Sequence, residues 1–232
     1  MADKFSSADP VGATVKPAPA RDVALRIVAI MANGAASYAA HANCMLESVV
    51  RLDIAITGHR PADLVKDGQP IDLPATTIEF LKRAAARARS LGASQVRVIT
   101  GGALGVDQEV AAAVAAHPEV SGIAFEYTVI LPFPIEIMGK YWSASDRQRL
   151  ADLVATAAES PPPITSSFAS WAYHARNAAM VDASDLVMAF WSGKKNGGTY
   201  QCLRYALMNA KPPRLCYNAL NGFLPIRRDA VA

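Results

Sequence analysis

The stretch "VITGGALGVDQEV", Val98 to Val110, decides the fold, because it joins a strand pattern to a helix pattern across a glycine-rich turn. Its apolar start continues the run "QVRVIT" (95–100), and its end opens the alanine-rich run "LGVDQEVAAAVAAH", which Pro118 stops. Two adjacent glycines let the backbone turn sharply between them. The stretch therefore predicts a strand, a tight turn and a helix, in that order.

The same alternation continues along the chain. Short apolar runs predict strands over 52–57, 95–100, 126–133, 185–191 and 213–218. Helical patterns lie between or after them, over 73–92, 104–117, 143–159, 167–184 and 197–210, with Thr76 or Thr77 and Ser143 or Ser145 as expected caps of the first and third. Because the strands are almost continuously apolar, we expect both faces of the sheet to be covered. The pattern predicts an α/β, Rossmann-like three-layer fold with a mostly parallel central sheet.

Length and composition suit one domain with an appendage. The 232 residues are 52% hydrophobic and 19% charged, which is a globular composition. Residues 1–21 are rich in Pro, Ala, Ser and Lys and are expected to form a flexible tail. Residues 22–50 are expected to be an N-terminal extension, either with a helix from Ala35 to Val50 or with little functional weight. The Rossmann-like domain would then occupy 51–232.

The sequence composition argues against several classes of protein. Cys44, Cys202 and Cys216 lack CxxC spacing, so we expect no disulfide framework, no metal site and a cytoplasmic location. The N-terminus lacks a secretory h-region, and the apolar run Val23 to Ala32 is too short to span a bilayer. A net charge of +3 without a basic stripe gives no reason to expect nucleic acid as a partner, although it leaves room for a bound anion.

Polar and glycine-rich segments follow the strands. They read "TGHRP", "TGGALGVDQ", "LPFP" and "FWSGKKNGGT". In an open α/β sheet, ligands bind beyond the carboxyl ends of the strands, so these segments are expected to meet at one edge. Two of them open a helix directly after glycines, which presents free N–H groups and the positive end of the helix dipole to an anion. Each could also be a plain strand–helix turn, and neither matches a Walker A loop.

Most of the individual side chains at this edge have two possible roles. Asp107 and Gln108 could cap a helix or contact a ribose or base, and Thr199 could cap the next helix. His59 could donate a proton or only a hydrogen bond. Arg176 and Asn177 could contact a sugar or phosphate or tie helix to loop. The residues expected to contact a ligand are Thr57, Gly58, His59, Arg60, Gly101, Gly102, Leu104, Gly105, Asp107, Gln108, Pro132, Arg176, Asn177, Trp191, Gly197, Gly198 and Thr199.

Taken together, "ITGHRP", "TGGALGVDQ", "LPFP" and "YHARNAAMVDASDLVMAFWSGKKNGGT" resemble the SLOG superfamily, and within it the YpsA-like group, over about residues 52–218. The resemblance implies a Rossmann-like fold and a nucleotide ligand such as ADP-ribose, NAD or a nucleoside phosphate. Arg176-Asn177 and Gly197-Gly198-Thr199 are similar to motifs of the LOG phosphoribohydrolases. Asn177 stands where those enzymes have a lysine, and Cys202 where they have a glutamate, which argues against their reaction.

Three hypotheses follow. The first is a protein that binds or senses a small-molecule nucleotide, without a certain cofactor or catalytic residue. The alternative is a nucleotide-processing hydrolase of the N-glycosidic type, in which Asp107, Glu136 or His59 supplies acid–base chemistry and Arg176 holds the phosphate. The third is an interaction protein whose N-terminal extension mediates assembly. A homodimer is also expected by analogy, because related folds often pair through helices.

Overall fold

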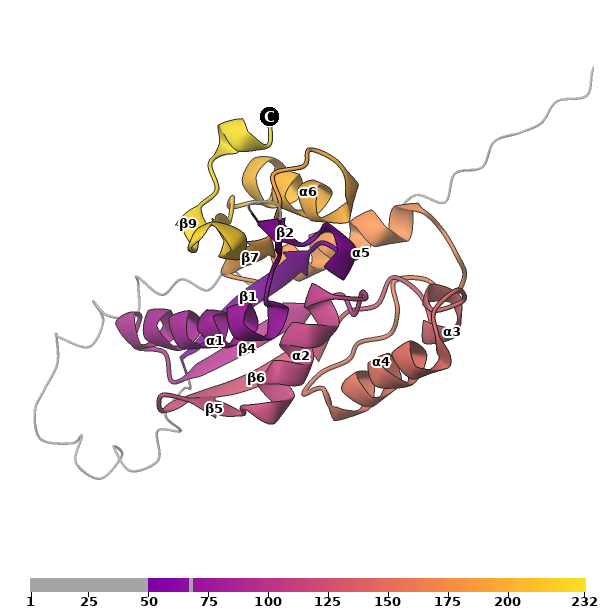
Figure 1. The fold of residues 1–232 in the computed structure, drawn as a ribbon, viewed down its shortest axis with the longest axis horizontal. Coiled ribbons are helices and arrows are strands. Elements are labelled where there is room, and N and C mark those ends of the chain that lie inside the picture. Colours follow the sequence, from indigo (N-terminus) through magenta and orange to yellow (C-terminus); the bar gives the residue numbers. More distant parts are fainter. Residues whose placement is uncertain (1–49, 67–68) are drawn as a thin grey trace, which may run out of the picture. The chain divides into compact units, whose positions relative to one another are not determined.

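The computed structural model describes residues 50–66 and 69–232 (Figure 1). The tail predicted over 1–21 lies outside these residues, as does the extension predicted over 22–50 apart from Val50. The helices are α1 (Leu73–Ser90), α2 (Val106–Ala116), α3 (Ile135–Met138), α4 (Ala144–Thr156), α5 (Trp171–Asp182) and α6 (Gly197–Arg204). The strands are β1 (Arg51–Gly58), β2 (Val65–Lys66), β3 (Gln69–Pro70), β4 (Gln95–Thr100), β5 (Glu119–Val120), β6 (Ile123–Val129), β7 (Leu186–Phe190), β8 (Leu215–Asn218) and β9 (Leu224–Pro225).

The main sheet has seven strands in the order β5-β6-β4-β1-β7-β8-β9. The five inner strands, from β6 to β8, run parallel to their neighbours, and β5 and β9 add an antiparallel strand at each edge. This confirms the predicted α/β fold with a mostly parallel sheet. The two edge strands were not predicted, because two-residue strands leave no readable period in the sequence.

Side chains of the central strands alternate between two separate cores. On β1, Ile54 and Ile56 belong to the core beneath α1 and α2, whereas Ala55 belongs to the core beneath α5 and α6. On β7, Met188 and Val187 divide in the same way. Because each strand is buried on both faces, its sequence is apolar throughout, and the three-layer arrangement is confirmed.

Several predicted boundaries need correction. The cap of α1 is Asp72, whose carboxylate accepts a hydrogen bond from the Ala75 amide at 2.9 Å, and not Thr76 or Thr77. Pro74 explains the earlier start, because proline fits the first turn of a helix, where its missing N–H is not needed. Ser143 is confirmed as the cap of α4. The third strand, predicted over 126–133, is β6 and ends at Val129.

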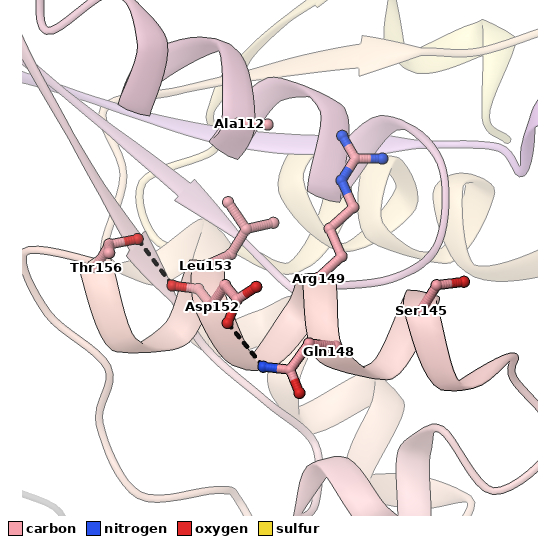
Figure 2. A pocket seen from close by; sticks show the side chains of 7 residues that line it. All are labelled: Ala112, Ser145, Gln148, Arg149, Asp152, Leu153 and Thr156. Carbon is pink, nitrogen blue, oxygen red and sulfur yellow. Dashed lines mark hydrogen bonds between the residues drawn. The ribbon is translucent and has the colours of Figure 1, made fainter.

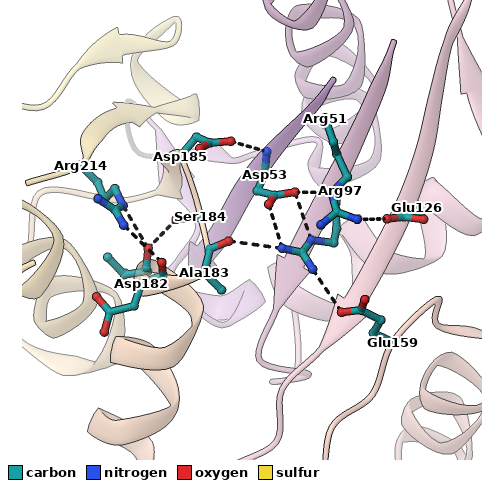
Figure 3. A network of polar contacts seen from close by, with 11 residues as sticks. Arg51, Asp53, Arg97, Glu126, Glu159, Asp182, Ala183, Ser184, Asp185 and Arg214 are labelled. Atoms are coloured by element: carbon teal, nitrogen blue, oxygen red, sulfur yellow. Dashed lines mark hydrogen bonds and ion pairs between the residues drawn. The ribbon is translucent and has the colours of Figure 1, made fainter. Parts of the chain in front are cut away.

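Opposite charges alternate across the amino ends of three strands (Figure 3). Asp53 on β1, Arg97 on β4 and Glu126 on β6 are register partners in neighbouring strands. Arg97 donates to Asp53 at 2.8 Å and to Glu159 at 3.1 Å, and Arg51 joins Asp53 to Glu126 at 2.8 and 3.0 Å. The Arg97 and Asp53 side chains are only 12% and 10% exposed, so their charges depend on each other for compensation.

We predict that Arg97→Met lowers the free energy of unfolding by about 2–4 kcal/mol, because it leaves the mostly buried Asp53 with Arg51 as its remaining cation. The matched control is Arg149→Met, which breaks the ion pair between Arg149 and Glu109. Their side chains are 47% and 26% exposed. It should cost under about 1 kcal/mol. Urea denaturation of both variants measures the difference, and equal losses would contradict the assignment.

Candidate functional site

A cleft of about 840 Å³ opens at the carboxyl edge of the sheet. Its walls come from the end of β1, the loop between β4 and α2, one face of α5 and the loop between β7 and α6. It is lined by Ile56, Thr57, Gly58, His59, Arg60, Asp63, Ala103, Leu104, Asp107, Ser170, Tyr173, His174, Arg176, Asn177, Met180, Lys194, Asn196, Gly197, Gly198, Thr199 and Gln201. The expectation that the polar strand ends meet at one edge is therefore confirmed for three of the four segments.

Most of the predicted ligand-contacting residues line this cleft. They are Thr57, Gly58, His59, Arg60, Leu104, Asp107, Arg176, Asn177, Gly197, Gly198 and Thr199. Six others lie outside the lining, namely Gly101, Gly102, Gly105, Gln108, Pro132 and Trp191. The structure explains most of these exclusions by packing.

The guanidinium of Arg176 lies at the base of the cleft. Its side chain is 9% exposed, and its Nη1 lies 3.6 Å from a carboxylate oxygen of Asp107, beyond hydrogen-bond distance. Nε and Nη1 are buried and have no hydrogen-bond partner among the described residues. Unsatisfied buried donors of a charged group cost free energy, so this arginine is suited to an anion that would complete its bonding.

Gly101 makes room for that guanidinium. A Cβ atom placed on Gly101 would lie 1.3 Å from Nη1 of Arg176. A Cβ atom on Gly102, whose φ is +69°, would meet Leu150 and Leu131 at 2.9 and 3.0 Å. The glycine pair was expected to face a ligand. It lies instead against protein side chains, because the turn packs tightly on α4 and α5.

We predict that Gly101→Ala displaces Arg176 and destabilises the fold by about 1–3 kcal/mol, the usual cost of overpacking a close contact. Gly198→Ala is the matched control, because nothing lies within 4 Å of its Cβ position. Its unfolding free energy should stay within about 0.5 kcal/mol of the parent protein. Chemical denaturation measures both values. A harmless Gly101→Ala would show that the arginine is not held where the structure places it.

Asp107 and Gln108 hold the same turn in place. The Asp107 carboxylate accepts hydrogen bonds from the amides of Gly101 and Ala103, both at 3.2 Å, and Gln108 donates to the Gly102 carbonyl at 3.2 Å. Burial raises the pKa of Asp107, against the lowering effect of Arg176 and the two amides. The two readings left open for these residues were a helix cap and a contact with a ribose or base. The structure adds a third role, bracing of the turn before α2, and places Gly105 at the capping position.

Three helices begin at the cleft without a side-chain cap. They are α2, α5 and α6, whose capping positions are Gly105, Ser170 and Asn196. By contrast, α1 and α4 begin away from the cleft and are capped by Asp72 and Ser143. Uncapped N–H groups attract anions, and the helix dipole adds to the effect. The cleft therefore combines helix N-termini with a buried cation.

Asn177 ties α5 to the start of α6. Its side-chain amide donates to the Gly198 carbonyl at 3.3 Å, which supports the helix-to-loop reading for this residue. Thr199 is buried and does not occupy the capping position, which belongs to Asn196. The contact links α5 to the first turn of α6, and residues of both elements line the cleft.

Charged groups surround the mouth of the cleft. Lys194 pairs with Asp63 at 3.0 Å, and Arg60 is exposed. His59 hydrogen-bonds Ser192 at 3.1 Å, between Nε2 and the hydroxyl. Burial lowers the pKa of His59, while Asp63 opposes this effect and Lys194 adds to it.

Three exposed aromatic side chains lie close together in the sequence next to the cleft, and one of them, Tyr173, lines it. Tyr173 and Phe168 pack against the buried Phe133. Their ring centroids lie 5.1 and 5.5 Å, respectively, from the ring centroid of Phe133. Trp171 is 57% exposed and follows Ser170, which lines the cleft. We call Phe168, Trp171 and Tyr173 the aromatic rim. Its anchor Phe133 comes from the "LPFP" segment, which therefore supports the cleft without lining it.

Trp191 was expected to contact the ligand and is instead part of the core. It is 7% exposed and belongs to the cluster beneath α5 and α6. Its indole N–H donates to the Lys194 carbonyl at 2.9 Å. The residue thus shapes the β7–α6 loop from below.

The cleft contains two of the three residues that the hydrolase hypothesis offered for acid–base chemistry. Asp107 and His59 line the cleft, but Glu136 on α3 does not. Cys202 is fully buried, and burial raises its pKa to about 12. No group of three metal-ligating side chains is found within residues 50–66 and 69–232.

Sequence reasoning overlooked part of the lining. Asp63, Ser170, His174 and Asn196 were not singled out, although Asn196 has the residue type of a helix cap directly before two glycines. His174 lies three residues before Asn177, which places both on one face of α5. Asp63 comes from a 3₁₀ turn (Pro61–Asp63) that carried no readable signal.

A smaller hollow of about 390 Å³ lies between α2 and α4 (Figure 2). Ala112 of α2 faces side chains of α4, among them Arg149, Asp152 and Leu153. Gln148 donates to Asp152 at 2.8 Å, and the Thr156 hydroxyl donates to the Asp152 carbonyl at 2.8 Å. Its polar groups bond one another, so it offers no unsatisfied donor comparable to Arg176.

Comparison with known proteins finds a fold likeness. No protein-family profile and no curated protein matches the sequence. DNA processing protein A from Helicobacter pylori, described as having a unique single-stranded DNA binding mode, aligns with a TM-score of 0.48 and 17% identity over 74% of this chain and 70% of that chain. The protein of the same name from Streptococcus pneumoniae aligns at 0.48 and 10% identity, over 72% of this chain and 50% of its own. At this level the likeness concerns the Rossmann-like fold.

Two sequence-based expectations are corrected by this comparison. We expected a small-molecule nucleotide as the ligand, with a nucleotide hydrolase as the alternative, and we expected no nucleic-acid partner. The matched structures are of a DNA-processing protein, and the one from Helicobacter pylori is described as binding single-stranded DNA. The error came from weighing the net charge of +3, which says little about the local donors gathered at one edge.

No helix in the described part of the chain combines the length and apolar character needed to cross a bilayer.

Proposed function

We propose that the cleft binds single-stranded nucleic acid, with a phosphate at Arg176 and the α6 N-terminus and with bases against the aromatic rim. The observation that carries the proposal is the Arg176 guanidinium, which lines the cleft while its buried Nε and Nη1 lack partners among the described residues. A phosphate oxygen accepts such charge-assisted hydrogen bonds well. The α6 amides supply further donors at the same place.

The aromatic rim favours a strand over an isolated mononucleotide. Phe168, Trp171 and Tyr173 expose 66%, 57% and 37% of their surface within one short segment of chain. Single-stranded nucleic acid is held by aromatic faces beside a cationic groove, and every base can stack on them. A mononucleotide would occupy one such face, whereas a strand can use several.

Charges at the mouth suit a phosphodiester backbone that leaves the cleft. Arg60 is exposed, and Lys194 exposes 57% of its side chain despite its pairing with Asp63. Because both cations are exposed, they can neutralise phosphates outside the buried part of the cleft. The proposal agrees with what is described for the Helicobacter pylori protein, but it depends on this geometry.

We also propose that the chain belongs to the YpsA-like group and is located in the cytoplasm. We propose domain boundaries at residues 21 and 50.

The proposal predicts that a fluorescent single-stranded oligonucleotide binds the full chain, with an affinity that falls as salt rises. Trp171→Ala should weaken binding about 5- to 150-fold, since stacking of one base is worth about 1–3 kcal/mol. Tyr141→Ala is the matched control, because Tyr141 is 90% exposed and belongs neither to the cleft lining nor to the aromatic rim. Fluorescence anisotropy measures all three proteins.

The cationic groups are tested separately. Arg176→Met should abolish measurable binding, and Lys194→Gln and Arg60→Gln, which change exposed side chains, should each lower the affinity and the salt dependence. Lack of binding by the parent protein at low salt would refute the proposal. Equal affinity for double-stranded DNA, or unchanged binding by Trp171→Ala, would also contradict it.

A further inference from the structure

The floor of the cleft lies well below its mouth. Ile56, Met180 and Thr199 line the cleft and yet are 0%, 1% and 3% exposed, and Arg176 is 8% exposed. By contrast, the mouth carries Arg60 and Lys194, both exposed. The Arg176 guanidinium is therefore the buried cation of the cleft, and the two exposed cations lie at its mouth.

This depth bears on which phosphate of a strand reaches Arg176. An internal phosphodiester carries a nucleotide on each side, so both neighbours would have to leave through the same mouth. A strand end carries a nucleotide on one side only and can enter the recess directly. The cleft volume of about 840 Å³ is in the range of sites for single small ligands, which also favours an end.

The charge of the phosphate also favours binding of a strand end. A phosphate monoester carries about −1.5 to −2 charges at pH 7 and three strong acceptor oxygens, more than a diester offers. The lining can supply the Arg176 guanidinium together with the uncapped N–H groups that begin α6 after the exposed Asn196. Asp107 is the acidic residue in ion-pair contact with Arg176, and it is already held by the amides of Gly101 and Ala103.

We propose that the floor of the cleft recognises the terminal phosphate monoester of a nucleic-acid strand. This inference rests on the proposed function and names which part of the strand binds. The remaining nucleotides would then leave past the aromatic rim and the cations of the mouth.

The test compares four labelled single-stranded oligonucleotides of one sequence: 5′-phosphorylated, 3′-phosphorylated, hydroxyl-ended and circular. We expect one of the phosphorylated ends to bind about tenfold more tightly than the hydroxyl-ended and circular forms, a difference of about 1.4 kcal/mol. The two phosphorylated forms identify the end. If all four forms bind equally, the inference is overturned and the proposed function stands. If none binds, the proposed function fails as well.

Asn196→Asp locates the preference. An aspartate at this capping position would stabilise α6, so misfolding is not expected to confound the result. Its carboxylate would occupy the α6 amides and repel a dianion more than a diester. The preference for the phosphorylated end should fall below about threefold, as expected when charge-assisted bonds are lost.

Ser143→Asp is the matched control, because it adds the same charge at the cap of α4, which begins away from the cleft. It should keep the full preference. A preference that survives Asn196→Asp would place the phosphate elsewhere and overturn the inference.

Discussion

The burial of the Arg176 guanidinium beside Asp107 is the constraint on which the carboxyl edge of the sheet depends. A buried cation needs compensation, and Asp107 supplies its charge at 3.6 Å without a hydrogen bond. Gly101 leaves the space that the guanidinium fills, and Asp107 in turn fixes the amides of Gly101 and Ala103. One interaction thus links the turn before α2 to α5 at the cleft.

The two edges of the sheet solve the problem of buried charge differently. At the amino edge, every guanidinium nitrogen of Arg97 donates at least one hydrogen bond, to Asp53, to Glu159 or to the Ala183 carbonyl (Figure 3). At the carboxyl edge, two guanidinium nitrogens of Arg176 have no partner among the described residues. The first arrangement stabilises the fold. The second leaves bonding capacity for a ligand, as expected where function and stability compete.

The sequence predicted the fold well because its signals are local. Apolar strands, helical periods and the serine cap of α4 each fall within a few residues. The short edge strands β5 and β9 and the Asp72 cap were missed. The roles of Gly101 and Trp191 could not be predicted, because they depend on contacts with Arg176 and with the core that only the folded chain creates. The net charge of +3 led to the expectation of no nucleic-acid partner. A binding site depends instead on the hydrogen-bond donors and charges gathered at one place.

The most direct measurement is a two-dimensional ¹H–¹⁵N NMR titration of the labelled protein with a single-stranded oligonucleotide, following the Arg176 Nε–H signal and the backbone amides. The account predicts that the Arg176 signal and the amides of Gly198 and Thr199 shift together, with saturation at one concentration. Shifts confined to the hollow between α2 and α4, or an Arg176 signal that does not move while the oligonucleotide binds, would contradict it.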